Sequence, residues 1–197
     1  WSSGVCSSDL SGNTFLLASV TALVAVPLSI LLGLIAATKP NGKVDKVISG
    51  VTLTLISIPD FLVAVILVSI FSVQLGWLPA LSTLRPNSDF LQIARTLALP
   101  VTALSFTILA HMARMTRTAV INVLTTPAIE MAILKGVPKS RILLIHALLN
   151  AIAPIINVIA LNLAYLISGV VVIETLFNLN GLGKLMVEAV TSRDVPL

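Results

Sequence analysis

Long apolar runs alternate with short polar segments along most of this sequence. The runs cover residues 10–38, 47–71, 96–113 and 142–173, and only the second contains a charged residue, Asp60. A helix needs about 20 apolar residues to cross a bilayer, with a range of about 17 to 25. We therefore predict an all-α fold, a polytopic transmembrane helical bundle with about four spans.

The composition excludes an ordinary soluble domain. Hydrophobic residues make up 57% of the chain and charged residues 10%, and the mean hydropathy is +1.06. Soluble domains carry about 25% charged residues. The formal net charge of +4 lies mainly in the short segments between the apolar runs. We interpret it as a signal of membrane orientation and not of nucleic-acid binding.

The distribution of Lys and Arg predicts which segments face the cytoplasm. Segments 39–46 and 114–141 hold three and five of the 12 basic residues, whereas segment 80–96 and the tail after Ile173 hold two each. Short cytoplasmic loops are enriched in Lys and Arg. With four spans, the first two segments are predicted to be cytoplasmic and both ends of the chain to lie outside.

Asp60 follows Pro59 inside the second apolar run. An ionised aspartate at the centre of a bilayer costs about 2.5 to 3.5 kcal/mol on insertion scales, so its side chain should face protein or water. Two roles are open. Asp60 caps a half-helix that restarts at Phe61 after the proline break, or it lines a translocation path and meets a cationic group of the substrate.

A charged amphipathic segment between the last two apolar runs predicts an L-shaped pair of helices. Pro127 suits the first position of a short helix, with Thr126 before it as the N-cap. Gly136 suits the left-handed conformation that ends a helix. Pro138 then opens a second helix, which enters the apolar run at Ile142. The alternative is an ordinary amphipathic connector between two membrane helices.

The last apolar run carries a row of polar residues. His146, Asn150 and Pro154 are spaced by four, so they share one helix face, and Asn157 lies close to it. Buried amides in membranes hydrogen-bond to neighbouring helices. We therefore predict that this face is a helix contact. A catalytic role for His146 is disfavoured because no acid or nucleophile lies near it in sequence.

The two ends of the chain differ from the apolar centre. Residues 174–197 are too charged to span a membrane, and the apolar spacing from Leu182 to Ala189 predicts a short amphipathic helix on the outer surface. Residues 1–12 are serine-rich and unlike the remainder, so we place them outside the domain. The predicted domain covers residues 13–197.

The residue types argue against several kinds of chemistry. Cys6 is the single cysteine, and His111 and His146, the two histidines, are 35 residues apart, so we expect no disulfide and no metal site. The NGLGKL sequence departs from a phosphate-binding loop, because Asn178 occupies the position of the first glycine and Leu185 follows the lysine. We expect no cofactor, no metal and no catalytic residue.

Several motifs together resemble one family. Glu130-Met131-Ala132, followed by Gly136, resembles the cytoplasmic EAA loop of binding-protein-dependent ABC transporter permeases. HALLNAIAP at 146–154 is similar to the form found in the dipeptide, oligopeptide and nickel branch. VQLGWLPA, RMTRTAVINVL and ETLFNLNGLGKLMVEAVTSRDVP agree with that branch, and the resemblance covers residues 14–197.

The sequence departs from the family pattern at a few points. Met131 replaces the first alanine of the EAA pattern, Ala128 stands where an aromatic residue is common, and Leu149 stands where the general pattern has a proline. Members of this branch typically have six spans. We therefore expect that this chain lacks the first and the last span of the transmembrane domain.

The resemblance implies a permease subunit of a type I ABC importer for peptides or a related small solute, in a bacterial or archaeal plasma (inner) membrane. The implied partners are a second permease subunit, two ATP-binding subunits that hydrolyse the ATP, and an extracytoplasmic solute-binding protein, with no nucleic acid and no catalysis by this chain. The alternative is a secondary transporter or channel, for which only Asp60 offers an ion-binding acid.

The resemblance and the residue pattern together give three groups of candidate site residues. The coupling loop, 127–149, transmits motion from the ATPase; the second group makes helix contacts or lines the pathway; the third gates the outer face or contacts the binding protein. The members are, respectively, Ile129, Glu130, Ala132, Ile133, Lys135 and Gly136; Asp60, His146, Asn150 and Asn157; and Glu174, Gly181, Gly183, Arg193 and Asp194.

Overall fold

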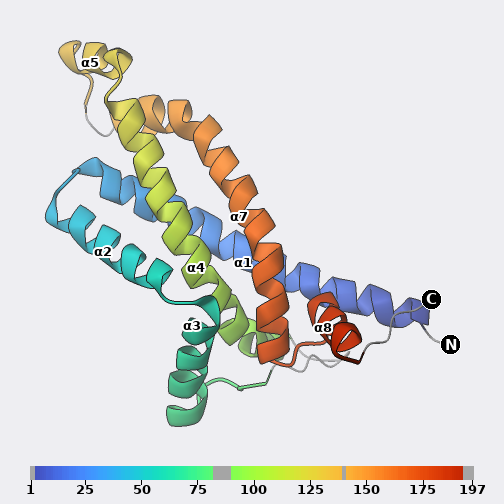
Figure 1. Ribbon diagram of the computed structural model, residues 1–197. Helices are drawn as coiled ribbons and strands as arrows, with labels where there is room; N and C mark the ends of the chain where they lie inside the picture. Colours follow the sequence, from blue (N-terminus) through green and yellow to red (C-terminus); the bar gives the residue numbers. More distant parts are fainter. Residues whose placement is uncertain (1–2, 82–89, 139–140, 193–197) are drawn as a thin grey trace. The chain divides into compact units, whose positions relative to one another are not determined.

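The computed structural model describes residues 3–81, 90–138 and 141–192, and these residues form helices joined by short loops, with no strand among them (Figure 1). This confirms the all-α prediction. The helices, in chain order, are α1 (Ser3–Thr38), α2 (Lys43–Ser57), α3 (Asp60–Leu67), the π-helix η1 (Val68–Gln74), α4 (Phe90–Leu124), α5 (Pro127–Leu134), the π-helix η2 (Ile142–Ala147), α7 (Leu148–Leu176) and α8 (Leu182–Ser192).

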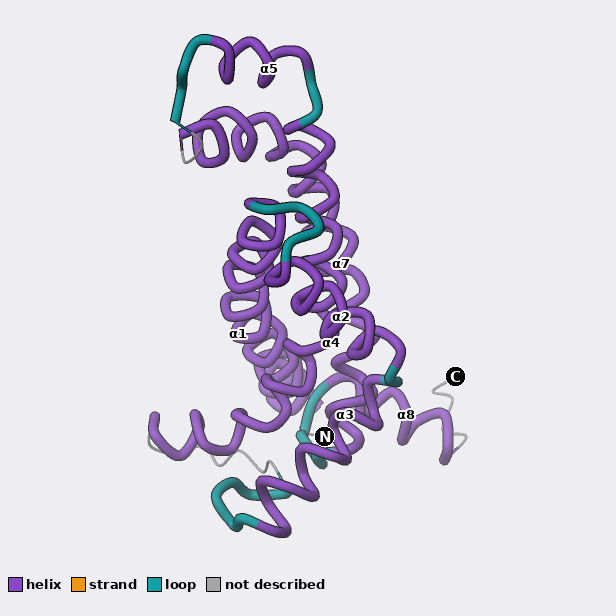
Figure 2. The backbone as a smooth tube through the Cα atoms, turned by 90° about the vertical axis from the view of Figure 1, so that its left-hand side faces the viewer, coloured by secondary structure: helices purple, strands orange, loops and turns teal. Residues whose placement is uncertain are grey.

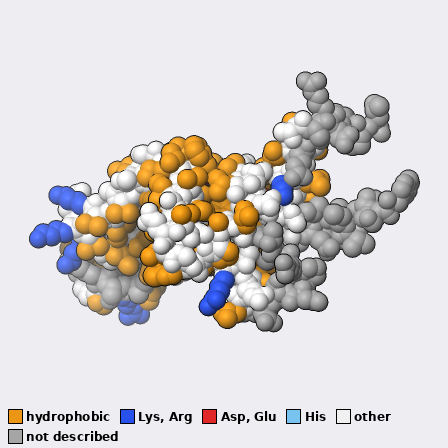
Figure 3. Space-filling model, turned by 90° about the horizontal axis from the view of Figure 1, so that it is seen from below, with side chains coloured by type: hydrophobic (Ala, Val, Ile, Leu, Met, Phe, Trp, Pro, Cys, Tyr) orange, Lys and Arg blue, Asp and Glu red, His pale blue; other side chains and the backbone are white. Residues whose placement is uncertain are grey.

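Three of the described helices are long and apolar enough to cross a membrane. They comprise residues 11–38 of α1, residues 91–124 of α4 and the whole of α7, and α2 with α3 and η1 is a fourth candidate if the broken pair counts as one span. Hydrophobic side chains cover much of the described surface on the face shown in Figure 3. Such a surface is stable against hydrocarbon, which confirms the prediction of a polytopic membrane protein.

Two helices continue through charged residues, beyond the ends of the predicted spans. The third span was predicted to stop at Ala113, but α4 continues through Arg114 and Arg117 to Leu124. The fourth was predicted to stop at Ile173, but α7 includes Glu174. A helix continues through a charged residue when that residue has a partner or reaches a polar surface. Both Arg117 and Glu174 have such partners, described below.

The chain forms two compact units, and α1, α4 and α7 contribute residues to each. The second unit comprises residues 24–57 and 107–164. Its hydrophobic core joins the end of α1, the end of α4, η2 and the start of α7. Alanines at these contacts allow the helix backbones to approach closely, as is usual between membrane helices. The buried members of this core are Leu34, Ala37, Val120, Ala147, Ala151 and Ile155.

Gly33 is required where α1 meets α4 in the second unit. A Cβ atom at Gly33 would lie 2.7 Å from the Thr116 Cβ and 2.8 Å from the Ala113 carbonyl oxygen. We expect Gly33→Ala to destabilise the protein by about 1–3 kcal/mol, because extra volume in a tight contact forces the helices apart. The measurement is the thermal midpoint in detergent.

Gly50 in α2 provides the matched control for that substitution, because a Cβ there meets nothing within 4 Å. Gly50→Ala removes a flexible residue from a helix interior and should leave the midpoint unchanged or raise it. Equal midpoints for Gly33→Ala and the parent protein would show that the contact is not tight.

The first unit comprises residues 1–23, 58–106 and 165–197. Within it, the described helices are the start of α1, α3 with η1, the start of α4, the end of α7, and α8. Large apolar side chains from three of these helices and from the turn after α7 are fully buried. They include Leu17, Leu99, Leu166, Ile173 and Phe177.

Candidate functional site

The short helix α5 has the boundaries that its sequence predicted. It begins at Pro127 and ends before Gly136, which has the predicted left-handed backbone with φ of +76°. The Gly136 N–H donates to the Ile133 carbonyl at 2.9 Å, and the Val137 N–H donates to the Ala132 carbonyl at 3.2 Å. This pair of hydrogen bonds is a Schellman motif, which closes the helix without relying on any side chain.

The predicted capping by the Thr126 side chain is wrong. Thr126 occupies the N-cap position with an extended backbone, but its side chain makes no capping hydrogen bond. Its hydroxyl donates instead to the Val123 carbonyl at 2.7 Å. That carbonyl belongs to the last turn of α4 and also accepts the Thr126 N–H at 3.0 Å. Thr126 therefore closes α4, and Pro127 starts α5.

The side chains of α5 divide into an inner and an outer set. Ile129 is only 2% exposed, and α5 packs against η2. Leu134 is 81% exposed, and Met131 and Ile133 are also exposed. In Figures 1 and 2, α5 lies beyond the end of α4, with a loop on each side. Of the six predicted coupling residues, Ile129 thus anchors the helix, Ala132 is half-buried, and Glu130, Ile133, Lys135 and Gly136 are exposed.

The helix after α5 continues into α7, as predicted. The N–H groups of Arg141 and Ile142 each donate to the Pro138 carbonyl at 3.0 Å, so helical bonding starts from Pro138. The residues that follow form η2, which is continuous with α7. η2 therefore connects the loop after α5 to α7 without a break.

The polar residues predicted to share one face of α7 are exposed in the described chain. Asn150, Pro154 and Asn157 are exposed, whereas Ala151 and Ile155 are buried in the core. Small and aliphatic side chains form the helix core of this unit. The backbone of His146 lies in η2, and its side chain is outside the described part of the structure.

Asp60 occupies a different position from the one predicted. α3 starts at Asp60 itself, Pro59 is at the N-cap position, and no side chain caps the helix. The capping interpretation is therefore wrong. The Tyr165 hydroxyl of α7 donates a hydrogen bond to Asp60 Oδ2 at 3.1 Å, and Asp60 is half-buried. Asp60 thus lies in the first turn of α3, where the helix dipole favours a negative charge.

Glu174 is the centre of a buried polar cluster in the first unit. It is 1% exposed and accepts hydrogen bonds from Thr14 Oγ1 at 2.6 Å, the Gly183 N–H at 2.8 Å and the Lys184 N–H at 3.3 Å. The last two donors belong to the first turn of α8. One carboxylate from α7 therefore satisfies the N-terminus of α8, where a negative charge is favoured, and holds it to α1.

The glycines around Glu174 leave room for its carboxylate. A Cβ atom at Gly181 would overlap the carboxylate, and one at Gly183 would lie 2.7 Å from the Val171 Cα. The turn is also held by the Leu182 N–H, which donates to Thr14 Oγ1 at 3.0 Å. The structure thus brings together Glu174, Gly181 and Gly183, which the sequence had grouped. Arg193 and Asp194 lie outside the described residues.

An ion pair that the sequence reasoning missed joins α2 to α4 in the second unit. Asp45 is 3% exposed, and Arg117 donates to both of its oxygens, from Nε at 2.5 Å and from Nη2 at 2.6 Å. The Asn41 N–H donates to the same carboxylate at 2.7 Å, and the Ser49 hydroxyl at 3.2 Å. The charge count had placed Asp45 and Arg117 on one side of the membrane, and that was the available signal.

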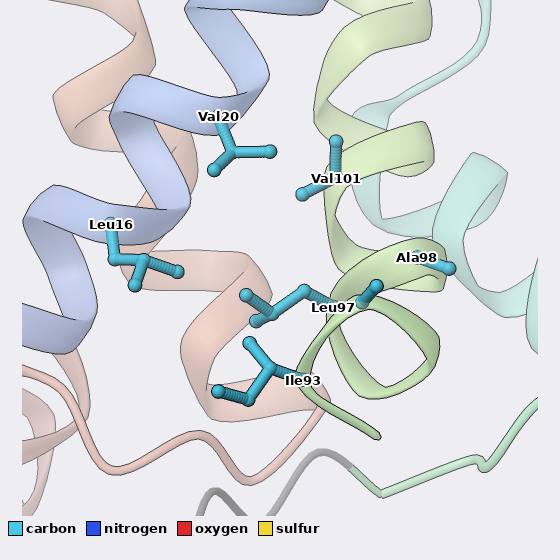
Figure 4. A pocket seen from close by; sticks show the side chains of 7 residues that line it. Leu16, Val20, Ile93, Leu97, Ala98 and Val101 are labelled. Carbon is cyan, nitrogen blue, oxygen red and sulfur yellow. The ribbon is translucent and has the colours of Figure 1, made fainter. Parts of the chain in front are cut away.

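A cavity of about 320 Å³ lies between α1 and α4 in the first unit (Figure 4). Figure 4 shows Leu16 and Val20 of α1 opposite side chains of α4. All of its lining side chains are aliphatic, so it suits hydrocarbon and offers no group for a charged or polar solute. The residues from α4 that line it are Ile93, Ala94, Leu97, Ala98 and Val101.

The chain matches one protein-family model and several curated relatives. The family model described as binding-protein-dependent transport system inner membrane component matches residues 29–197. The chain is 38% identical to the oligopeptide transport system permease protein OppB of Escherichia coli, over 96% of this chain and 61% of that protein.

Two further relatives have similar identity. The chain is 35% identical to the oligopeptide transport system permease protein AppB of Bacillus subtilis, over 94% of this chain and 59% of that protein. It is also 35% identical to the probable peptide ABC transporter permease protein y4tP of Sinorhizobium fredii, over 93% of this chain and 59% of that protein. The chain thus spans about three fifths of the length of these relatives.

Proposed function

Because this chain belongs to the family of binding-protein-dependent transport system inner membrane components, we propose that it acts as a permease subunit of an ATP-driven importer for peptides or a related small solute. The names of its relatives support peptides as the solute class. The structure supports this role through α5, a short helix capped at its C-terminal end and connected through η2 to α7.

The exposed surface of α5 is suited to a protein partner. It presents Met131, Ile133 and Leu134 between the exposed charges of Glu130 and Lys135. Apolar side chains rimmed by charges are typical of a protein-protein contact. The predicted orientation places this segment in the cytoplasm, where an ATP-binding subunit can reach it. ATP hydrolysis is assigned to that separate subunit.

Motion of α5 has a defined route to the membrane. α5 packs against η2 and buries Ile129. Ala147 of η2 and Ala151 of α7 share one core with Val120 of α4. Displacing α5 therefore moves the start of α7 and the end of α4 together, because packed helices transmit rigid shifts. In this proposal, closure of the ATP-binding subunits reorients α7 and opens the solute path.

The remaining assignments follow from the same proposal. The subunit lies in the plasma (inner) membrane with α8 on the outer side, and it pairs with a second permease, two ATP-binding subunits and an extracytoplasmic solute-binding protein. The exposed Asn150 and Asn157 of α7 face that second permease or the solute path. The turn around Glu174 presents α8 to the binding protein.

Cysteine cross-linking in the assembled complex tests the assignment of α5. In a Cys6→Ser background, Leu134→Cys and Met131→Cys are expected to cross-link to the ATP-binding subunit, because both side chains are exposed. The yield should change when nucleotide binds, since α5 moves with the ATPase. The measurement is the cross-linked band in complexes that retain ATP-driven uptake.

Val190→Cys is the matched control, because Val190 is 78% exposed on α8 and is predicted to lie on the opposite side of the membrane. It should give no cross-link to the ATP-binding subunit. The proposal is overturned if the α5 cysteines fail to cross-link in complexes that transport, or if Val190→Cys cross-links as efficiently as they do.

A further inference from the structure

We propose that Asp60 and Tyr165 form a site in the translocation path that holds a cationic group of the passing solute, an ammonium such as the amino terminus of a peptide. This inference rests on the proposed importer function and assigns a solute contact to two residues of the first unit. Its evidence is the broken helix, the exposure of the two side chains and their mutual hydrogen bond.

The helix break places Asp60 where polar groups need water or protein. Pro59 has no N–H, and its carbonyl accepts from the N–H groups of Leu62 and Val63 at 2.9 and 3.2 Å as α3 restarts. Within a membrane, non-helical backbone is tolerated only where it is buried in protein or lines a water-filled cavity. Discontinuous helices of this kind form the solute and ion sites of many transporters.

The exposure of the two side chains argues for an aqueous path on this side of the break. Asp60 is half-buried, and Tyr165 is 51% exposed, so neither is enclosed by the described chain. An ionised aspartate in hydrocarbon costs about 2.5 to 3.5 kcal/mol. A surface with this carboxylate therefore faces water or another subunit and not lipid. A solute path has such a surface.

The chemistry of the pair selects a cation. The Tyr165 hydroxyl donates to Asp60 Oδ2 at 3.1 Å, so the carboxylate and the tyrosine ring lie together. A carboxylate attracts a cation and repels an anion. The tyrosine ring adds a second attraction, because an ammonium within about 6 Å of an aromatic face is held by a cation–π interaction.

A resident metal ion is a poorer match for this pair. One carboxylate and one phenol supply fewer ligands than a bound calcium or zinc ion needs. No group of three His, Cys, Asp or Glu side chains that could hold a metal occurs among the residues that were described. A single anionic contact binds a transported solute weakly enough for the solute to be released.

The test measures local charge with a cysteine reporter. Ser168 is exposed on α7, three residues beyond Tyr165, so it lies on the same helix face. In the assembled complex with Cys6→Ser, Ser168→Cys is modified by a cationic and by an anionic methanethiosulfonate reagent, and the ratio of the two rates is measured. Asp60→Asn should lower the ratio of the cationic to the anionic rate severalfold, because removing a nearby negative charge slows the first reaction and speeds the second.

Two further variants separate charge from structure. Tyr165→Phe removes the hydrogen bond but retains the carboxylate, so it should leave the reagent ratio near the parent value. Ile167 is 68% exposed but lies on another face of α7, and the reactivity of Ile167→Cys should not depend on Asp60. An equal effect of Tyr165→Phe and Asp60→Asn would assign the pair a structural role only.

The inference is overturned if Ser168→Cys reacts with neither reagent while Val190→Cys on α8 reacts, because that surface then faces lipid. It is also overturned if the ratio is unchanged by Asp60→Asn. ATP-driven uptake by the parent complex is measured in parallel. If the parent complex shows no ATP-driven uptake, the importer function is contradicted. If uptake is present but Asp60→Asn leaves the ratio of reagent rates unchanged, only the assignment of Asp60 and Tyr165 is contradicted.

Discussion

Replacement of Glu174 by alanine is expected to destabilise the protein by about 3–5 kcal/mol and to release α8 from the end of α7. The carboxylate is 1% exposed and accepts hydrogen bonds from Thr14, Gly183 and Lys184. Removing it leaves these donors unsatisfied, and a buried unsatisfied donor costs about 1–3 kcal/mol. The truncation also leaves a cavity.

Two measurements detect this change in the assembled complex. The thermal midpoint in detergent reports the loss of stability, and limited proteolysis of residues 177–192 reports the release of α8. Thr175→Ala is the matched control, because Thr175 is the next residue of α7, is exposed, and donates only to its own helix at Val172. Equal proteolysis of Glu174→Ala and Thr175→Ala would show that Glu174 does not hold α8.

Conservative and steric variants sharpen the same prediction. Glu174→Gln keeps the side chain's size and one acceptor oxygen but loses the charge, so it should lose less stability than Glu174→Ala. Gly183→Ala should destabilise the protein by about 1–3 kcal/mol, because its Cβ would lie 2.7 Å from the Val171 Cα, a backbone atom that cannot move freely. Gly12→Ala, which meets nothing within 4 Å, should not.

The sequence predicted α5 well because the signals for it are local. Pro127 and Gly136 act through their own backbone preferences, and the structure has both in the expected conformations. The role of Thr126 was harder to predict because its hydroxyl could either donate to a carbonyl at the end of α4 or accept from an N–H at the start of α5. The hydroxyl donates to the Val123 carbonyl, which also accepts the Thr126 N–H at 3.0 Å.

The helix ends were less predictable because they depend on partners distant in sequence. Arg117 remains in α4 because Asp45, 72 residues away, neutralises it. Glu174 remains in α7 because Thr14, 160 residues away, helps to satisfy it. The family resemblance had grouped Glu174 with Gly181 and Gly183, but no periodicity or spacing could show that the glycines make room for the carboxylate.

Which face of α7 is buried depends on tertiary packing. The spacing placed Asn150 and Asn157 on or near one face, and the structure has them exposed. The choice of the neighbouring alanine face for the contact reflects how closely small residues allow helices to approach. That preference involves α1 and α4, so the pattern of α7 alone could not decide which face is buried.

Arg117→Ala is expected to destabilise the second unit by about 3–5 kcal/mol. The substitution leaves the Asp45 carboxylate, which is 3% exposed, without its bidentate partner. Removing one member of a buried ion pair is costly because the remaining charge is buried without compensation. Arg114→Ala is the control, because Arg114 is an exposed basic residue one turn earlier on α4, and its loss should cost less than about 0.5 kcal/mol.

A double-mutant cycle separates the ion pair from other effects of these substitutions. Asp45→Asn removes the charge that Arg117→Ala strands, so the double variant should be more stable than the sum of the single changes predicts, by about 1–3 kcal/mol. Additive effects would contradict a direct interaction. The Asn41 and Ser49 hydrogen bonds to Asp45 are expected to persist in part with an asparagine, since its amide oxygen still accepts.

The same pair is expected to matter for coupling in the proposed importer. Arg117 fixes α4 to α2 two turns before α4 ends at Leu124, and α5 starts three residues later. A firm end of α4 lets force on α5 move the helix core, whereas a loose end absorbs that force. Arg117→Ala should therefore lower uptake per ATP hydrolysed more than it lowers ATP hydrolysis, measured in proteoliposomes below the variant's thermal midpoint. An unchanged ratio of uptake to hydrolysis would confine the ion pair to stability.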